Sequence, residues 1–316
     1  MIHFLRLIRY KNLLIIILTQ YLMRFSIIKP ILEVHNLKLQ FTELNFFLLV
    51  MALVFVTAAG YVINDYFDTK TDLVNRPDKV IIGKKLNRRW AIKLHVLLNI
   101  IGIGLGTYVS FYIKKPILSL VFVFITTLLW FYSTSYKRQF FIGNIIVSLL
   151  TATVPLIVIL FEIPLLKEQY GLIVNKMPEI ITNIILWGSA FSLFAFLLTL
   201  IREIVKDIED FDGDIAFGRK TMPIVLGIAN SKLIVVAFII TTLFSLLYFN
   251  FQFLNDKLTL VYFVIFLISP LLFLTYKIVS ANTKKDYHLA NVLLKFIMLS
   301  GILYALLANY FIVNHF

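Results

Sequence analysis

The chain of 316 residues contains no cysteine and few charged residues. Without cysteine it can form no disulfide, no thiolate nucleophile and no thiolate metal site. Charged residues make up 15% of the chain, against about 25% in an ordinary soluble domain. Hydrophobic residues make up 60% and the mean hydropathy is +0.91. Many apolar runs approach or exceed the roughly 18 to 20 residues that cross a bilayer as a helix, so the sequence predicts a polytopic membrane protein.

Several motifs of soluble enzymes are also missing. The sequence has no phosphate-binding G-x-x-x-x-G-K-[ST] loop, and its five scattered histidines include no pair at metal-binding spacing. The formal net charge of +13 suits cytoplasmic loops beside anionic lipid, so we expect no nucleic-acid partner. The basic start is followed by an apolar run without a small-residue cleavage site, which we interpret as a first span and not as a signal peptide.

The apolar runs predict an all-α fold, a transmembrane bundle of about nine helices forming a single domain over residues 1–316. The expected spans are 12–29, 43–63, 90–113, 116–135, 140–161, 180–203, 231–252, 258–279 and 289–312. If the N-terminus is cytoplasmic, 19 Lys and Arg residues lie in cytoplasmic loops and 7 lie outside. The positive-inside rule therefore predicts a multi-pass protein of the cell membrane with a cytoplasmic N-terminus.

Two groups of carboxylates stand out in this apolar chain. The first acid cluster is Asp65, Asp68 and Asp72, and the second acid cluster is Asp207, Asp210 and Asp214. In both clusters the steps of three and four residues would place the carboxylates within a stripe about 60° wide on one helix face. Like charges at that spacing destabilise a helix, so a compensating cation is expected. Both clusters fall on the predicted cytoplasmic side, after the second and sixth spans.

Oxygen ligands without His or Cys favour a hard cation such as Mg²⁺, Mn²⁺ or Ca²⁺ over zinc. Two facing carboxylate clusters would hold metal ions on either side of a diphosphate and make it a better leaving group. Asn64 adds a neutral oxygen beside Asp65. The alternative is that the acids are simply solvated at cytoplasmic loops.

Basic residues alternate with the acids and predict phosphate contacts. They are Arg76 after the first acid cluster, Lys137 at the end of the fourth span, and Arg202 and Lys206 before Asp207. The positive-inside bias alone would also supply such cations. A diphosphate held at the membrane surface above a bundle rich in Phe and Tyr suits a polyisoprenyl diphosphate. Tyr66, Tyr132 and Tyr136 are placed to stabilise an allylic cation with their aromatic faces.

The quoted segments resemble the UbiA-type intramembrane prenyltransferases. NDYFDTKTDLVNRP resembles their N-D-x-x-D-x-x-x-D signature, DFDGD their second Asp motif, and YSTSYKRQFFIGN their Y-x-x-x-K-R stretch. The resemblance implies helices around a central cavity, Mg²⁺ held by both Asp motifs, and transfer of a prenyl group from a prenyl diphosphate to an acceptor. By position it assigns Asn64, Asp65, Asp68 and Asp72 to the first motif, Asp210 and Asp214 to the second, and Lys137 to diphosphate contact; Arg9 lies at the family's usual start.

The acceptor is less defined than the donor. REIVKDIEDFDGD is similar to the branch that geranylgeranylates geranylgeranylglyceryl phosphate, and Arg202 and Lys206 would suit such an anionic acceptor. Members that prenylate aromatic quinone precursors, 4-hydroxybenzoate or dihydroxynaphthoate, are similar overall. A transporter is the alternative of another class, because intramembrane acids often mark ion pathways. Here the acids cluster at span ends and not near the bilayer midplane, which favours surface chemistry over transport.

Overall fold

The structure is a computed structural model that describes residues 2–315. Within that range it is helical, with no β-strand beyond one isolated bridge between Ile82 and Leu86. Nine helical stretches of the described chain are long and apolar enough to cross a membrane, which confirms the predicted bundle. They are Tyr10–Val34, Glu43–Asn75, Arg88–Tyr112, Pro116–Arg138, Ile142–Lys176, Glu179–Glu209, Ile228–Leu254, Lys257–Ser280 and Lys284–Asn314.

Several spans are assembled from shorter segments, some with π-helical or 3-10 turns. In chain order the elements are α1 (Ile2–Leu7), α2 (Tyr10–Leu22), η1 (Met23–Ile28), α3 (Lys29–Val34), α4 (Glu43–Asn75), η2 (Pro77–Lys79), α5 (Arg88–Tyr112), η3 (Pro116–Leu118), α6 (Ser119–Thr134), η4 (Tyr136–Arg138), α7 (Ile142–Lys176), α8 (Glu179–Glu209), α9 (Phe211–Ala216), α10 (Met222–Leu226), α11 (Ile228–Phe249), η5 (Asn250–Leu254), α12 (Lys257–Phe263), η6 (Val264–Ile268), α13 (Ser269–Ser280) and α14 (Lys284–His315).

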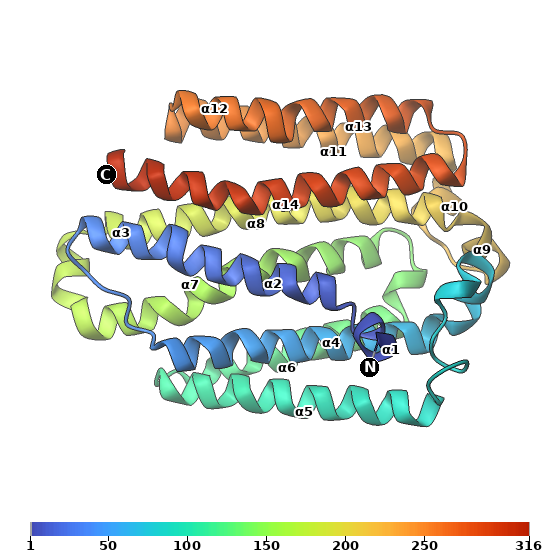
Figure 1. Ribbon diagram of the computed structural model, residues 1–316, viewed down its shortest axis with the longest axis horizontal. Coiled ribbons are helices and arrows are strands. Elements are labelled where there is room, and N and C mark those ends of the chain that lie inside the picture. Colours follow the sequence, from blue (N-terminus) through green and yellow to red (C-terminus); the bar gives the residue numbers. More distant parts are fainter. Residues whose placement is uncertain (1, 316) are drawn as a thin grey trace.

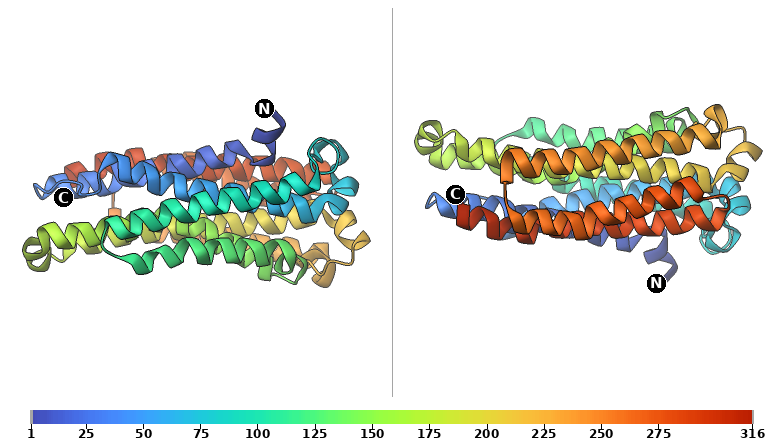
Figure 2. Two further views of the ribbon diagram at one scale, coloured as in Figure 1. Left: turned by 90° about the horizontal axis from the view of Figure 1, so that it is seen from below. Right: turned by 90° about the horizontal axis from the view of Figure 1, so that it is seen from above.

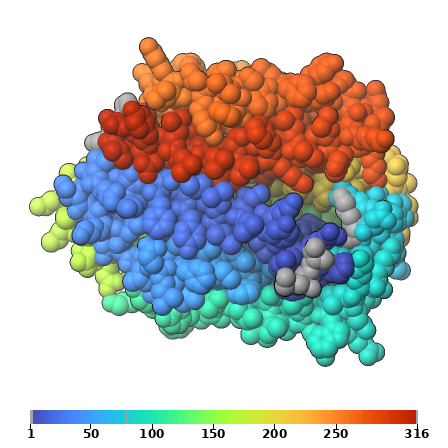
Figure 3. Space-filling model, in the orientation of Figure 1, coloured from blue at the N-terminus to red at the C-terminus, as the bar shows by residue number. Residues whose placement is uncertain are grey.

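The long helices share one long axis, and the views from below and above show the same arrangement (Figure 1, Figure 2). α4 packs against α5 and α6, α7 packs against α8, and α8 packs against α14. The short helices α9 and α10 gather at one end of the bundle, with the segment that joins α4 to α5 (Figure 1). On the surface the blue α2 lies beside the red α14 (Figure 3), so the first and last spans are neighbours. The chain therefore closes into a ring of helices.

Local sequence explains where several helices begin. The Thr42 side chain accepts a hydrogen bond from the Asn45 amide at the start of α4, and Asn87 accepts one from the Arg89 amide at the start of α5. Asp256 caps α12 in the same way through the Thr259 amide. Such side chains satisfy backbone N–H groups that the first helical turn leaves without partners.

A buried ion pair fixes the end of the bundle opposite α9. Arg24 in η1 is 1% exposed, and its guanidinium lies 3.4 Å from Glu162 of α7 and 3.0 Å from Glu43 of α4. Glu162 also accepts hydrogen bonds from the backbone amides of Gln40 (2.7 Å) and Phe41 (3.2 Å). Arg24 donates to the Phe41 carbonyl as well. These contacts hold η1, the segment before α4, and α7 together. Losing Arg24 would leave the buried charge of Glu162 unpaired, which is strongly destabilising.

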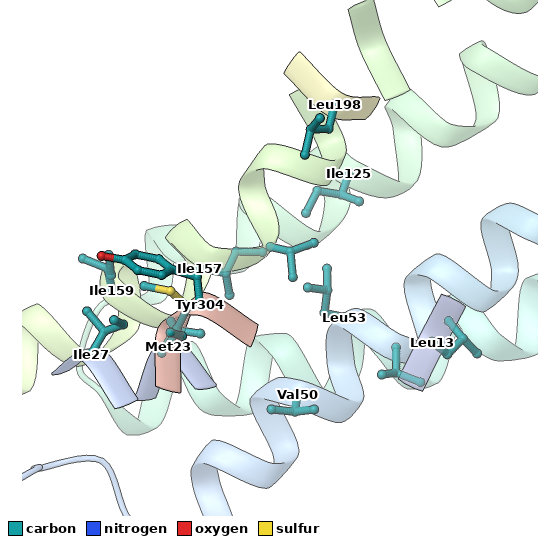
Figure 4. Packing of buried hydrophobic residues seen from close by; sticks show 14 of the residues in the cluster. Leu13, Met23, Ile27, Val50, Leu53, Ile125, Ile157, Ile159, Leu198 and Tyr304 are labelled. Carbon is teal, nitrogen blue, oxygen red and sulfur yellow. The ribbon is translucent and has the colours of Figure 1, made fainter. Parts of the chain in front are cut away.

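The buried apolar side chains surround a central space and do not fill it completely. In Figure 4, Leu53 of α4, Ile125 of α6, Leu198 of α8 and Tyr304 of α14 come from four different helices. All four line one cavity of about 320 Å³. The fold therefore places a mostly apolar chamber inside the bundle, as the family resemblance implied.

Candidate active site

The first acid cluster lies on one continuous helix, as its spacing predicts. α4 does not end where the predicted span ends at residue 63 but runs on to Asn75, so Asp65, Asp68 and Asp72 belong to its last turns. Arg9, in the link between α1 and α2, places its Nη2 2.8 Å from an oxygen of Asp65. The predicted site residue Arg9 is thus brought to the first acid cluster.

Lys137 reaches the same face of α4. Its Nζ lies 2.7 Å from Asp68 and donates a hydrogen bond to Asn64 Oδ1 at 3.2 Å. Lys137 sits in η4, directly after the fourth span, and is buried. Asp72 is half-buried and accepts no hydrogen bond or ion pair through its carboxylate from the described part of the chain. Asp72 therefore keeps its oxygens available for another ligand.

The second acid cluster differs from its prediction, because it does not lie on one helix. α8 ends at Glu209, Asp210 follows it, and Asp214 belongs to the short α9. The Asn75 side chain holds the break between α8 and α9. Its Nδ2 donates to the backbone carbonyl of Asp210 (3.3 Å), and its Oδ1 accepts from the backbone N–H of Gly213 (3.1 Å). A Cβ at Gly213 would lie 2.4 Å from the Asn75 side chain, so this contact requires glycine.

The contacts of Asn75 and Arg76 at the end of α4 bring the two acid clusters to one end of the bundle. Arg76 follows Asn75 and places its Nη2 3.0 and 3.2 Å from the two carboxylate oxygens of Asp210. It also lies 3.2 Å from Glu209, which pairs in turn with His288 of α14 at 3.1 Å. Asp207 accepts a hydrogen bond from Asn144 of α7 at 2.8 Å.

Arg219 joins the clusters directly. Its Nη2 lies 2.5 Å from Asp68 and donates to the Thr71 hydroxyl at 3.1 Å, while its Nη1 lies 3.2 Å from Asp214. Burial disfavours the guanidinium charge, but the carboxylates of Asp68 and Asp214 outweigh it and raise the pKa of Arg219. Burial raises the pKa of Asp214 to about 6, although Arg219 pulls it down.

The cavity lining reaches this polar end through Arg9, which pairs with Asp65, and Asn64, which accepts a hydrogen bond from Lys137. Its polar lining consists chiefly of Arg9, Asn12, Asn64, Arg202, Glu203 and Lys206, and its apolar lining includes Ile125, Leu150, Val154, Phe191, Phe249 and Leu267. Along α8 the lining residues run from Trp187 to Lys206, about 28 Å at the helical rise of about 1.5 Å per residue. The predicted phosphate contacts Arg202 and Lys206 thus face the cavity. Tyr132 also lines it, whereas Tyr66 packs under the Arg88 guanidinium and Tyr136 against Phe131.

The acid clusters fit a hard divalent cation by their chemistry. Both supply only carboxylate oxygens, the ligands that Mg²⁺ and Ca²⁺ prefer. The Asp72 carboxylate has no hydrogen-bond or ion-pair partner among the side chains that the structure describes, and the buried Oδ1 of Asp214 receives no well-directed hydrogen bond from them, although Arg219 lies 3.2 Å away. In the described chain no three acids or histidines are grouped closely enough to hold a metal as they stand. The guanidinium of Arg219 bridges Asp68 and Asp214, and the ammonium of Lys137 pairs with Asp68.

Comparison with known proteins settles the family. The model of the UbiA prenyltransferase family matches residues 36–313. The chain belongs to this family. Digeranylgeranylglyceryl phosphate synthase of Thermococcus kodakarensis is 33% identical over 201 residues, which cover 63% of this chain and 64% of the relative. The enzyme of the same name from Thermococcus gammatolerans is 36% identical over 171 residues, covering 54% of this chain and 52% of that one. The aligned segments thus span less than two thirds of these relatives.

Solved structures of UbiA proteins share the fold. A structure of digeranylgeranylglyceryl phosphate synthase superposes with a TM-score of 0.63 at 22% identity over 97% of both chains. A UbiA homologue from Archaeoglobus fulgidus, solved with DMAPP and Mg²⁺, gives a TM-score of 0.57 at 13% identity over 99% of both chains. These matches confirm the nine-helix architecture of a multi-pass membrane protein.

Sequence reasoning missed several residues that the UbiA fold brings to the site. Arg219 is one of them, and its position five residues after Asp214 is a usable signal in the sequence. Glu203 is another, and it lies on the cavity wall between Arg202 and Lys206. Asn75 and Asn144 contact acids 135 and 63 residues away. No periodicity could have paired them.

Proposed function

We propose that this protein transfers a polyprenyl group from a prenyl diphosphate to a lipophilic acceptor within the membrane, in a reaction that depends on Mg²⁺. The observation that carries the proposal is that the polar lining of the apolar cavity adjoins both acid clusters, because Arg9 pairs with Asp65 and Lys206 directly precedes Asp207. The diphosphate belongs at this polar end. The apolar lining along α8 runs from Trp187 to Leu198, about 16 Å at the helical rise, and suits the apolar prenyl chain.

The acid clusters would hold Mg²⁺ through Asp65, Asp68, Asp72, Asp207, Asp210 and Asp214. When bound, Mg²⁺ would neutralise the diphosphate and improve it as a leaving group. Lys137 and Arg219, now paired with Asp68, would exchange that carboxylate for diphosphate oxygens. Arg76 would hold Asp210 in place by its paired contacts to both oxygens.

The reaction then needs protection for a developing allylic cation. As the bond from the prenyl carbon to the diphosphate oxygen breaks, positive charge builds on the prenyl chain beside the polar end. Tyr61 and Tyr132 line the cavity there, and aromatic faces stabilise cations. The surrounding apolar wall excludes water, which would otherwise capture the cation.

We propose geranylgeranylglyceryl phosphate as the acceptor. The support is the name shared by the relatives, digeranylgeranylglyceryl phosphate synthase, and the cationic polar lining of the cavity. Arg202 and Lys206 are the proposed contacts to the acceptor phosphate. The positive-inside bias supports a cytoplasmic position for the N-terminus and for both acid clusters.

The test uses purified protein in detergent or vesicles with labelled geranylgeranyl diphosphate and Mg²⁺. We expect product with geranylgeranylglyceryl phosphate, none in EDTA, and none from Asp68→Ala or Asp210→Ala. Glu168→Gln, which removes an exposed ion pair with Lys114, is the control and should retain activity. Activity undiminished in EDTA would contradict the metal-dependent mechanism, and product with 4-hydroxybenzoate alone would replace the proposed acceptor by an aromatic one.

A further inference from the structure

Glu203 is the one carboxylate among the described residues that line the cavity. It lies on α8, six residues before that helix ends, and is 6% exposed. None of the six Asp residues of the two acid clusters lines the cavity within the described chain. An acid in this position faces the chamber in which prenyl chain and acceptor would meet, and the metal-binding role does not use it.

Cations hold the Glu203 carboxylate in place. Arg202 Nη1 lies 2.8 Å from one carboxylate oxygen, and Lys206 Nζ lies 3.7 Å from the other. The charged and titratable groups around it are Arg9 before α2, Tyr132 of α6, and Arg202, Lys206 and Asp207 of α8, and Lys295 of α14 lines the same cavity. With two adjacent cations, the ionised carboxylate is favoured before the acceptor arrives.

Prenyl transfer to a hydroxyl group releases a proton, and that proton needs an acceptor at the reacting oxygen. Charged Lys and Arg side chains have no lone pair to take it. The cavity wall offers Glu203 as the only carboxylate among its described residues, beside the cations proposed to bind the acceptor phosphate. A general base must reach the proton it removes, directly or through one water.

We propose that Glu203 is the proton acceptor for the acceptor hydroxyl; this inference rests on the proposed prenyl transfer. The prenyl C1–oxygen bond to diphosphate breaks, and the acceptor oxygen forms the new bond to C1. The hydroxyl proton passes to a Glu203 oxygen, and the electron pair of the broken bond leaves with the diphosphate. Arg202 and Lys206 then serve two purposes, since they bind the acceptor phosphate and position the base.

The competing interpretation is that Glu203 only balances the charges of Arg202 and Lys206. The two roles differ in what Glu203→Gln changes. A counterion role predicts weaker substrate binding and lower thermal stability in proportion to lost activity. The proton-acceptor role predicts loss of the transfer step, with the binding of the donor retained.

The experiment compares wild type, Glu203→Gln, Glu203→Asp and the control Glu168→Gln, with Mg²⁺ and geranylgeranylglyceryl phosphate. We expect Glu203→Gln to lower kcat about 100-fold or more, the usual effect of losing a general base. Its Kd for the unreactive geranylgeranyl thiolodiphosphate should stay within about threefold of wild type. Glu203→Asp should recover part of kcat, and Glu168→Gln should match wild type. The kcat of wild type should decrease toward acid pH as Glu203 becomes protonated. This acid limb of the pH profile should be absent in Glu203→Gln.

Transfer by Glu203→Gln within about threefold of wild type would overturn the inference, as would a rise in the thiolodiphosphate Kd that matches the fall in kcat. An unchanged acid limb in Glu203→Gln would overturn it as well. Wild-type protein that binds the thiolodiphosphate yet transfers to no acceptor would instead reject the proposed function itself, so the two failures are distinguishable.

Discussion

Asp68 of α4 and Asp214 of α9 share the guanidinium of Arg219, which lies 2.5 Å from the first and 3.2 Å from the second. The two acids belong to different acid clusters, and a cation of the protein itself bridges them. In this arrangement the mutual repulsion of the acids is balanced without a metal ion. Binding of a metal ion and a diphosphate would therefore require Arg219 to exchange partners, with diphosphate oxygens replacing the carboxylates.

Replacing Arg219 tests this exchange. Arg219→Gln should weaken binding of a prenyl thiolodiphosphate by about 10- to 100-fold, because hydrogen bonds to charged groups contribute about 1.5–3 kcal/mol. The metal-free variant should also unfold at a lower temperature than wild type, since Asp68 and Asp214 lose their shared counter-charge. Titration calorimetry and thermal unfolding in detergent, each with and without Mg²⁺, measure both effects.

Arg219→Lys is the informative partner variant. It retains the charge but loses the fork that reaches two carboxylates, so its affinity should fall between wild type and Arg219→Gln. Equal affinities in all three proteins would show that Arg219 does not contact the diphosphate.

Gly213 provides a steric test of the contact between α4 and α9. A Cβ there would lie 2.4 Å from the Asn75 side chain, whereas a Cβ at Gly104 in α5 would meet nothing within 4 Å. Gly213→Ala should therefore destabilise the protein by about 1–3 kcal/mol, the usual effect of overpacking, and lower prenyl transfer by displacing Asp210. Gly104→Ala, the matched control, should be neutral or stabilising because Ala favours the helix. Similar melting temperatures for the two variants would argue against a tight Asn75 contact.

Helix periodicity explains which part of the site was predictable. Asp65, Asp68 and Asp72 lie on an unbroken helix, so their spacing alone placed them on one face. The same spacing predicted one helix face for Asp207, Asp210 and Asp214, and this was wrong. α8 ends before Asp210, where Asn75 from the other half of the chain contacts the Asp210 carbonyl. The nine spans followed from apolar run lengths, yet the extension of α4 to residue 75 did not, since its last turns are polar and lie beyond the apolar run.

Lys295 illustrates a second limit, because the sequence alone does not distinguish a lysine that faces a cavity from one that packs within a span. Two contacts set the register of the antiparallel α8 and α14: Glu209 with His288 at one end, and Trp187 with Tyr304 near the other. Interpolation between them places Lys295 about level with Thr199, within one helical turn of Arg202, and Lys295 does line the cavity. A basic residue inside a membrane span generally marks a functional site.

From this register we predict that Lys295 contributes to binding the acceptor phosphate. Lys295→Met should raise KM for geranylgeranylglyceryl phosphate about tenfold and leave KM for the donor unchanged, because a charged hydrogen bond to one substrate is lost. Steady-state kinetics with each substrate varied in turn measure the KM for the acceptor and the KM for the donor separately. Lys93→Met is the matched control, since Lys93 lies in α5 over the Trp90 ring and outside the cavity lining. Equal increases in both KM values would point to a general disturbance of the bundle.

The buried pair of Arg24 and Glu162 allows a test of stability alone. Both side chains are 1% exposed, and Arg24 also pairs with Glu43 at the start of α4, whereas the first acid cluster lies in the last turns of that helix. Arg24→Met leaves Glu162 buried without its counter-charge, so the free energy of unfolding should fall by about 3–5 kcal/mol.

Two further variants separate the charge from the packing. In Glu162→Gln the side-chain amide oxygen can still accept hydrogen bonds from the backbone amides of Gln40 and Phe41, so this variant should lose less stability than Arg24→Met. The double variant Arg24→Met/Glu162→Gln should be more stable than Arg24→Met, because it leaves no isolated buried charge; Glu43, the other partner of Arg24, is exposed. Thermal unfolding of the four proteins gives the coupling energy, and prenyl transfer measured well below each melting temperature should be the same in all of them. A double variant no more stable than Arg24→Met would mean that the methionine disrupts packing, and that the loss of the ion pair is not the cause.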